Sequence, residues 1–417
     1  MTRPTPRRIV LAYSGGLDTS VAVRWIAEHW GAEVVALAVD VGQMPDADAA
    51  TWEEIRHRAL AAGAVAAEVV DARDEFATGF CARAIRANAL YERRYPLVSS
   101  LSRPLIARHL VAAARAHGAD AVAHGCTGKG NDQVRFEVSL RALAPDLEIL
   151  APVREWGLTR ADAIALAAQW RIPITASVEA PYSIDENLAG RAIECGAIED
   201  PWAAPPPEIW ARTVEVADAP REATEVVIGF ERGVPVSLDG APLALVEMLP
   251  ALDRIVGAYG AGRIDMVENR RVGIKSREVY ECPGMLTLID AHADLEAITL
   301  ERDVMHEKQR LEPRWAEVTY DGLWYSPLRE ALDAFIDSTQ RHVTGEVRVR
   351  LEPGRAAVVG RRAPRGLYDD ALATYEAHDA FRHQDAAGFV RLWGLSVETW
   401  ARRQRSEAPT PPPVDEP

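Results

Sequence analysis

The sequence predicts an α/β protein: a Rossmann-like, parallel-sheet nucleotide-binding domain, then an α+β domain, then a helical extension at the C-terminus. Three observations support this prediction. Short apolar runs alternate with helical stretches as far as residue 175, a glycine-rich segment follows the first run, and the alternation ends near residue 176. Strands that alternate with helices are typical of βαβ units, in which helices cover both faces of a mostly parallel sheet. A length of 417 residues is enough for two or three domains.

The first domain is expected to span residues 1–175 and to contain five strands and five helices. The strands are expected at 9–12, 34–39, 67–70, 119–123 and 148–151, and the helices at 19–30, 48–62, 73–90, 104–117 and 159–170. Val21 and Trp25 lie four residues apart, which places both on one face of the first helix. Pro104 is expected in the first turn of its helix and Gly118 just after that helix. Ligands of such a sheet bind beyond the carboxyl ends of the strands.

The rest of the chain is divided into a second domain, residues 176–365, a C-terminal helical oligomerisation segment, residues 366–405, and a disordered tail, residues 406–417. In the second domain the pattern predicts a hairpin at 225–238, a helix at 243–259, a mostly helical stretch at 283–342, and a second hairpin at 346–360. The tail is rich in proline, which disfavours a packed structure.

Composition excludes several classes of protein. A net charge of −15 argues against a broad nucleic-acid-binding face, so that phosphate must be captured by a local arrangement of donors. The four cysteines are scattered without a C-x-x-C pair, which indicates a reduced, cytoplasmic protein with neither a disulfide framework nor a zinc ribbon. No uncharged apolar stretch approaches the length of a membrane span, and nothing is expected to cross a membrane.

The segment Tyr13–Ser20, with the sequence YSGGLDTS, follows the first strand and opens the first helix. Its adjacent glycines, Gly15 and Gly16, expose backbone amides at a helix N-terminus, where dipole and donors favour an anion. Asp18 is expected to cap that helix. The segment has no lysine of the Walker A type, so it resembles instead the loop of ATP pyrophosphatases, which holds the pyrophosphate while a substrate attacks the α-phosphorus. The simpler alternative is a tight turn without a ligand.

A second loop, His124–Arg135, follows a later strand and has the sequence HGCTGKGNDQVR. Thr127, Asn131, Asp132 and Arg135 combine neutral, anionic and cationic groups, which suits a ligand that carries both an ammonium and a carboxylate. If a helix begins near Asn131, then Arg135 shares a face with it. From composition alone, a capped polar loop is an equally good interpretation. His124 lies at a strand end, and we interpret it as a structural residue.

With these two loops identified, the sequence resembles the argininosuccinate synthase family. The matching segments occur in order along the chain, at 13–20, 39–43, 95–104, 124–137, 182–187, 263–270 and 275–280. The resemblance implies that ATP is split to AMP and pyrophosphate while citrulline condenses with aspartate through a citrullyl-adenylate, with residues 176–365 as the synthetase domain. It also implies that Mg²⁺ accompanies ATP, and that the enzyme is a homotetramer whose C-terminal helices are exchanged. A helix that packs on its own chain is the alternative for residues 366–405.

The resemblance also implies a set of contacts. Nucleotide contacts fall on Ala12, Tyr13, Ser14, Gly15, Gly16, Leu17, Asp18, Thr19, Ser20, Val39 and Gly125. Aspartate contacts fall on Thr127, Asn131 and Asp132. Citrulline contacts fall on Tyr95, Ser100, Asn131, Arg135, Ser183, Glu268 and Tyr280. Asp18, Asp132 and Arg135 are expected to act in the chemistry, and no residue is assigned as a metal ligand.

Three points stay open at this stage. Ala192 stands where many family members have a second citrulline-binding serine, so one hydrogen bond, worth about 0.5–1.5 kcal/mol, is lost unless another group replaces it. The proton of the aspartate amine goes either to the adenylate phosphate or to Asp132. Two other functions remain as alternatives: a tRNA-modifying adenylating enzyme, which needs a basic RNA-binding surface, and a non-catalytic nucleotide-binding module, which has no use for the second loop.

Overall fold

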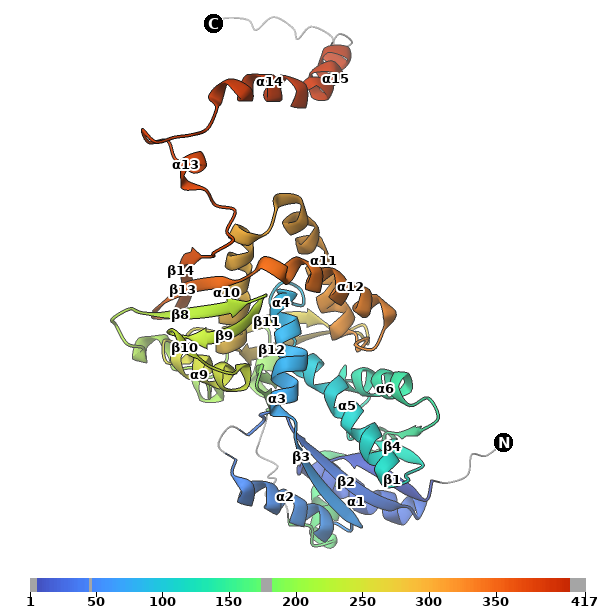
Figure 1. Ribbon diagram of the computed structural model, residues 1–417. Helices are drawn as coiled ribbons and strands as arrows, with labels where there is room; N and C mark the ends of the chain where they lie inside the picture. The colour runs from blue at the N-terminus through green and yellow to red at the C-terminus, as the bar shows by residue number, and fades with distance from the viewer. Residues whose placement is uncertain (1–5, 45–46, 174–181, 406–417) are drawn as a thin grey trace, which may run out of the picture. The chain divides into compact units, whose positions relative to one another are not determined.

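The computed structural model describes residues 6–44, 47–173 and 182–405 (Figure 1). The chain forms two compact units, Met1–Arg365 and Gly366–Pro417. The expected boundary between residues 175 and 176 lies outside the described residues, and so does the expected tail at 406–417. No helix of the described ranges is both long and apolar enough to span a bilayer.

The first part of the larger unit is built on a five-stranded parallel sheet with the order β3-β2-β1-β4-β5. The strands are β1 (Arg8–Ala12), β2 (Glu33–Asp40), β3 (Ala66–Asp71), β4 (Ala121–Ala123) and β5 (Glu148–Leu150), which confirms the expected α/β class. The strand order reverses between β1 and β4, so the loops after these two strands lie next to each other at the carboxyl edge. That edge is where both sequence motifs begin.

Helices cover both faces of this sheet (Figure 1). They are α1 (Leu17–Trp30), α2 (Ala49–Ala61), α5 (Val98–Ala116), α6 (Asp132–Leu143), α7 (Pro152–Glu155) and α8 (Arg160–Gln169). Ile9 and Leu11 of β1 pack in one core with residues of α1, α2 and α8. Val10, which points to the other face, packs in a second core with Leu101 and Leu105 of α5. Alternation of apolar side chains along buried strands therefore supplies both cores.

Two helices differ from the expectation. The helix expected at 104–117 begins at Val98, so Pro104 lies inside α5 instead of in its first turn. The added turns bury Ser99, Ser100 and Leu101, and this packing outweighs the weak helix propensity of serine. The helix expected at 73–90 is divided into α3 (Arg73–Phe76), a π-helical turn (Ala77–Cys81) and α4 (Ala82–Arg86). Local patterns do not report such interruptions, because they are set by packing.

The second part of the larger unit contains the two expected hairpins in one antiparallel sheet, with the order β10-β9-β8-β13-β14. The strands are β8 (Thr224–Glu231), β9 (Val234–Leu238), β10 (Ala241–Pro242), β13 (Gly345–Glu352) and β14 (Arg355–Arg362). The helices are α9 (Leu245–Gly257), α10 (Pro283–Thr299), α11 (Arg302–Tyr320) and α12 (Pro327–Thr339). Short 3₁₀ turns lie at Gly196–Glu199, Pro207–Ile209, Val216–Asp218 and Gln340–His342.

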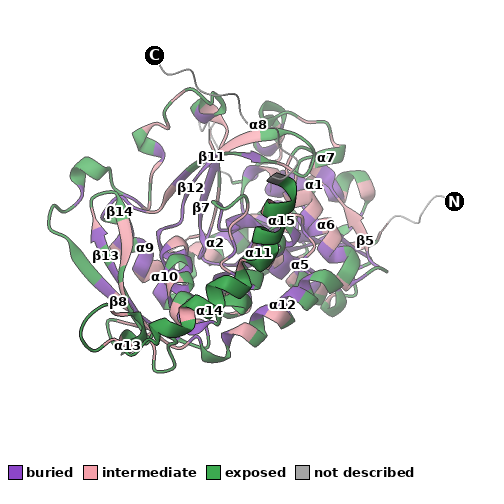
Figure 2. Ribbon diagram, turned by 90° about the horizontal axis from the view of Figure 1, so that it is seen from above, coloured by how far each residue is buried: buried purple, intermediate pink, exposed green. Residues whose placement is uncertain are grey.

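A four-stranded antiparallel sheet with the order β11-β12-β7-β6 was not expected from the sequence. Its strands are β6 (Ser183–Asn187), β7 (Gly190–Glu194), β11 (Arg263–Asn269) and β12 (Lys275–Glu281). Nearly all of β7 is buried (Figure 2). In β11 the buried series runs Ile264, Met266, Glu268, so that a carboxylate takes a place where the strand pattern requires an apolar residue. Polar residues on the inner face therefore hide this sheet from sequence patterns.

The smaller unit is less helical than expected for residues 366–405. It contains α13 (Asp370–Ala373), α14 (His383–Trp393) and α15 (Leu395–Arg405), with a non-helical connection between α13 and α14. Large apolar side chains of α14 and α15 are exposed within the unit, among them Phe389 at 60% and Trp393 at 73%.

Candidate active site

The first motif forms a turn between β1 and α1. Gly15 has φ of +76°, which glycine adopts without strain, and its carbonyl accepts a hydrogen bond from Arg58 at 2.7 Å. The N-cap of α1 is Gly16, and no side chain in the described part of the chain caps this helix. Ser14 Oγ lies 3.1 Å from Thr19 Oγ1 and 3.3 Å from the amide nitrogen of Gly16. The turn therefore presents hydroxyls and uncapped helix amides to an anion.

Asp18 is not the N-cap that the sequence analysis expected. Because α1 begins at Leu17, Asp18 lies in the first turn. Burial raises the pKa of its carboxyl, and the positive charge of Arg160 opposes this rise. A carboxylate in the first turn of a helix is still favoured by the helix dipole. Its oxygens are, however, not used for capping.

The second motif leaves β4 and turns into α6 at Asn131, its N-cap. The two motifs touch each other at Gly125, where a Cβ atom would lie only 2.9 Å from Cγ2 of Thr19. Only glycine allows this approach without a shift of the neighbouring helix. The expected i, i+4 relation holds, since the amide of Arg135 donates to the carbonyl of Asn131 at 3.2 Å. Both motifs therefore line one edge of the sheet as a single structure.

Two cavities adjoin at this edge. The first, of about 250 Å³, is lined by six of the residues expected to contact the nucleotide: Ala12, Tyr13, Ser14, Thr19, Val39 and Gly125. The other five lie on the turn and the start of α1, outside this lining: Gly15, Gly16, Leu17, Asp18 and Ser20. The hydroxyl of Ser20 lies 2.9 Å from that of Tyr13, so Ser20 positions a residue of the wall.

The second cavity, of about 400 Å³, brings together residues from both parts of the larger unit. Its wall includes seven residues expected to contact aspartate or citrulline: Tyr95, Thr127, Asn131, Asp132, Arg135, Ser183 and Glu268. Ser100 and Tyr280 lie outside this wall. Tyr280 is fully buried, and its hydroxyl lies 3.1 Å from Glu268. The buried hydroxyl of Ser100 has no hydrogen-bond partner among the described residues. The lining also includes Ala192, where the family serine is replaced.

Arg103 and Asp185, which the sequence analysis missed, lie in the wall that the two cavities share. Arg103 donates to Asp132 Oδ2 at 2.8 Å and to Asp185 Oδ2 at 2.5 Å. Arg135 donates to the other oxygen of Asp132, also at 2.8 Å. Burial works against ionisation of Asp132, but the charges of Arg103 and Arg135 outweigh it and hold the pKa of this carboxyl well below its usual range. Asp132 is therefore a carboxylate at neutral pH.

A second missed group lines the larger cavity only: Glu194, Arg270 and Glu278. The guanidinium of Arg270 donates to Glu194 and, at 2.7 Å, to Glu278. The single hydroxyl proton of Tyr280 faces two carboxylates, Glu278 at 2.8 Å and Glu268 at 3.1 Å. Burial, together with the charge of Glu268, raises the pKa of Glu278 to about 7. Glu194 and Glu278 lie in the sheet that apolar patterns did not reveal, and Arg270 directly follows its strand β11. Only the matched segments at 182–187, 263–270 and 275–280 pointed to this sheet.

A histidine and a cysteine near the cavities, His124 and Cys126, have structural roles. His124 is fully buried, its ring stacks on Phe136, and its Nδ1 accepts from the amide of Cys126 at 3.3 Å. Its Nε2 lies 3.5 Å from Glu137. Burial raises the pKa of the Cys126 thiol, which disfavours the thiolate required of a nucleophile. The chemistry of this site therefore depends on arginines, carboxylates and hydroxyls.

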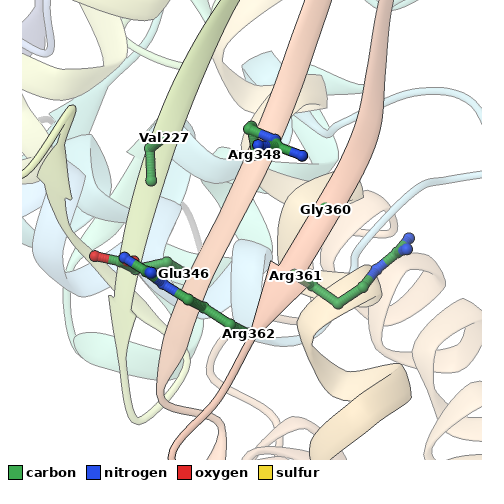
Figure 3. A pocket seen from close by; sticks show the side chains of 6 residues that line it. All are labelled: Val227, Glu346, Arg348, Gly360, Arg361 and Arg362. Atoms are coloured by element: carbon green, nitrogen blue, oxygen red, sulfur yellow. The ribbon is translucent and has the colours of Figure 1, made fainter. Parts of the chain in front are cut away.

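A separate hollow of about 310 Å³ lies on the outer face of β8, β13 and β14 (Figure 3). Its lining includes Arg348, Arg361 and Arg362, which pair with Glu225, Asp294 and Glu346 respectively. Because each of these arginines already has an acidic partner, the hollow does not present the unpaired positive charge that an anionic ligand requires.

Comparison with known proteins decides the family. Residues 8–173 match the model of the argininosuccinate synthase N-terminal HUP domain, and residues 182–400 match the model of the C-terminal domain. The chain belongs to the argininosuccinate synthase family. As an argininosuccinate synthase it is an ATP-dependent ligase of arginine biosynthesis. This assignment replaces both alternatives left by the sequence, the tRNA-modifying enzyme and the non-catalytic module.

Two relatives illustrate the similarity across the synthase. The argininosuccinate synthase of Thermosynechococcus vestitus is 55% identical over 399 residues, which cover 95% of this chain and 98% of the relative. That of Gloeobacter violaceus is 55% identical over 397 residues, with the same coverage of 95% and 98%. Among solved structures, the U34-tRNA thiolase NcsA from Methanococcus maripaludis is 14% identical, covers 44% of this chain and 63% of its own, and has a TM-score of 0.28. A likeness this weak carries no functional argument.

Proposed function

We propose that this synthase activates the ureido oxygen of citrulline as an adenylate and that the two adjoining cavities hold the reactants. One observation supports this most strongly: both cavities are lined by Ser14, Arg103, Gly125, Cys126, Asp132 and Asp185. A nucleotide in the smaller cavity therefore meets an amino acid in the larger one across a shared wall. Reactants held in this way gain an effective molarity that reaches about 10⁵ M or more for well-oriented groups.

The nucleotide is assigned to the turn and the smaller cavity, through the residues expected from the sequence: Ala12 to Ser20, Val39 and Gly125. The uncapped amides at the start of α1 support a role in holding the pyrophosphate leaving group, because developing negative charge is stabilised by fixed donors. Val39 is a buried side chain on the wall of this cavity and contributes an apolar surface.

Mg²⁺ is proposed to accompany ATP. The described residues contain no group of three acidic, histidine or cysteine side chains that would cage an ion. This agrees with the usual binding of Mg²⁺ by substrate phosphates plus one or two carboxylates. Asp18, on the phosphate-binding turn and not used as a cap, is the carboxylate that we assign to this role. A bound Mg²⁺ would neutralise charge on the phosphates of ATP.

In the first step, the ureido oxygen of citrulline attacks the α-phosphorus, a phosphorus–oxygen bond forms, and the bond to pyrophosphate breaks. In the second step, the aspartate amine attacks the activated carbon, and the carbon–oxygen bond to AMP breaks. We assign citrulline to Tyr95, Ser100, Asn131, Arg135, Ser183, Glu268 and Tyr280. We assign aspartate to Thr127, Asn131 and Asp132. The three ionised side chains expected to act in the chemistry, Asp18, Asp132 and Arg135, then hold charges in place during both steps.

Asp132 is proposed to anchor the aspartate ammonium and not to act as the base. Each of its oxygens already accepts from a guanidinium, which supports a permanent negative charge with a low proton affinity. An oxygen of a carboxylate accepts more than one hydrogen bond, so the ammonium still has an acceptor. We therefore assign the amine proton to the phosphate of the departing AMP.

Labelling the ureido oxygen of citrulline with ¹⁸O tests the adenylate. The label is expected in AMP, because the ureido oxygen leaves bound to the α-phosphorus. Formation of AMP is also expected to require citrulline, and argininosuccinate to require aspartate as well. AMP without label would contradict the mechanism.

We further propose that the enzyme is a cytoplasmic homotetramer that exchanges its C-terminal segments. The exposed apolar side chains of α14 and α15 support the exchange, and the four unpaired cysteines support a reducing compartment. Light scattering on a chain truncated after Arg365 is expected to show a smaller assembly than the full chain. An unchanged tetramer would refute the exchange.

A further inference from the structure

Tyr320, the last residue of α11, connects two elements that line the larger cavity, α6 and β11. Its side chain is 1% exposed, and its hydroxyl contacts residues from two different parts of the chain. The amide nitrogen of Asn131 donates to this hydroxyl at 2.8 Å, and the hydroxyl donates to Glu268 Oε1 at 2.8 Å. One hydroxyl therefore spans from the N-cap of α6 to β11.

The same residue also holds Arg135. The guanidinium Nε of Arg135 donates to the carbonyl of Tyr320 at 3.1 Å, and its carbon lies 4.8 Å from the centre of the tyrosine ring. Two residues further on, Gly322 packs so closely that a Cβ atom would lie 2.8 Å from Cα of Arg135. The turn after α11 thus packs closely against the first turn of α6.

The hydrogen bonds of Asn131 fix the direction of its amide group. Its oxygen accepts from the amide of Arg271 at 2.9 Å, and its nitrogen donates to Tyr320. An asparagine amide offers two N–H groups and two oxygen lone pairs, so one of each remains for a substrate. Burial raises the pKa of Tyr320, and the hydroxyl therefore stays protonated and donates to Glu268. The side chains of Asn131 and Glu268 are thereby each held in one orientation.

We propose that the Tyr320 hydroxyl is a positioning group for citrulline, because its hydrogen bonds hold the side chains of Asn131 and Glu268, which both line the cavity. This inference rests on the proposed assignment of Asn131, Arg135 and Glu268 to citrulline. Tyr320 itself is not part of the cavity lining, so it acts through these neighbours. Nothing in the sequence pointed to it, since it is 189 residues from Asn131 and 52 from Glu268.

The substitution Tyr320→Phe removes only the hydroxyl and therefore tests its role separately from that of the ring. Phenylalanine keeps the backbone carbonyl, the ring under Arg135, and the ring stacked 3.5 Å from Tyr91. We expect the KM for citrulline to rise about ten-fold, as two lost hydrogen bonds predict, with the KM for ATP changed less than about two-fold. Tyr259→Phe is the matched control, since its mostly buried ring loses a hydroxyl bond to the carbonyl of Glu222 away from both cavities. It is expected to change neither constant.

A double-mutant cycle with Asn131→Ala separates positioning from a general structural role. In the Asn131→Ala background, Tyr320→Phe is expected to raise the citrulline KM by less than in the unmodified enzyme, because one of its two partners is already gone. Equal effects in both backgrounds, or an equal rise in the KM for ATP, would overturn the inference. A normal citrulline KM in Asn131→Ala alone would instead refute the proposed citrulline site. Thermal unfolding of each variant shows whether the folded state is kept.

Discussion

Arg103 donates to Asp132 at 2.8 Å from the wall that the two cavities share. This ion pair stands where the nucleotide and the amino acids are proposed to meet. Because Arg103 also binds Asp185, one guanidinium joins α5, α6 and β6. The charge where the two cavities adjoin is thus set by a half-buried network of three side chains and not by a single residue.

Asp132→Asn is expected to slow condensation more than adenylate formation. The amide cannot hold the aspartate ammonium as an ion pair, and a lost charged hydrogen bond typically costs about 1.5–3 kcal/mol, or ten- to a hundred-fold in rate. Single-turnover release of AMP and of argininosuccinate measures the two steps separately. Asp162→Asn, on the exposed cap of α8, serves as the control. Equal losses in both steps would indicate that Asp132 supports the nucleotide site or the fold.

Gly125→Ala is expected to weaken ATP binding. The new Cβ would lie 2.9 Å from Thr19, so one of the two motifs must shift. We expect the KM for ATP to rise about five-fold or more, as overpacking of about 1–3 kcal/mol predicts. Gly128→Ala is the matched control in the same loop, because its Cβ would meet only the Arg154 side chain at 3.8 Å. If both variants bound ATP normally, close contact between the motifs would have no part in binding.

Ala192→Ser is expected to strengthen citrulline binding. Ala192 lies in the cavity wall and pairs with Tyr280 on β12, so a serine places a hydroxyl beside the proposed citrulline contacts. One added hydrogen bond of about 0.5–1.5 kcal/mol lowers the KM for citrulline by roughly two- to ten-fold. Ser183→Ala, on β6, is expected to change the constant in the opposite direction. An unchanged KM in Ala192→Ser would mean that another group already replaces the missing serine.

Glu278 is expected to make the stability of the enzyme depend on pH near neutrality. Its pKa is raised from an ordinary value of 4.5 to about 7, so the folded state binds this proton more tightly than the unfolded state does. The corresponding stabilisation is complete below pH 4.5 and is lost as pH rises through about 7. It amounts to at most about 3 kcal/mol. Titration with urea between pH 5 and 8 measures this loss.

The variant Glu278→Gln lacks this titration, and its stability is expected to fall less than that of the unmodified enzyme over the same range. Glu307→Gln, an exposed carboxylate on α11, is the control and is expected to follow the unmodified enzyme. Parallel curves for Glu278→Gln and the unmodified enzyme would show that Glu278 is already ionised at pH 5.

Local sequence patterns were enough to predict much of the fold of this protein. The parallel strands, the two hairpins and both glycine-rich motifs follow from apolar spacing and turn residues, which act over a few neighbouring positions. The resemblance of whole segments then identified the family. The predicted N-cap of α1, Asp18, was nevertheless wrong. Whether Gly16 or Asp18 is the N-cap depends on where the chain leaves β1.

Only the tertiary structure decided which groups meet. Arg103, Asp185, Glu278 and Tyr320 lie on four separate elements, and no local pattern relates them to the motifs. Their charges and hydroxyls become informative only when the fold removes them wholly or partly from water, because a polar group that loses water contacts requires another partner. The sequence alone thus determined the family and the turn that we propose to bind phosphate. The order β1-β4 and the convergence of α11 on α6 determined how the substrate cavity is built.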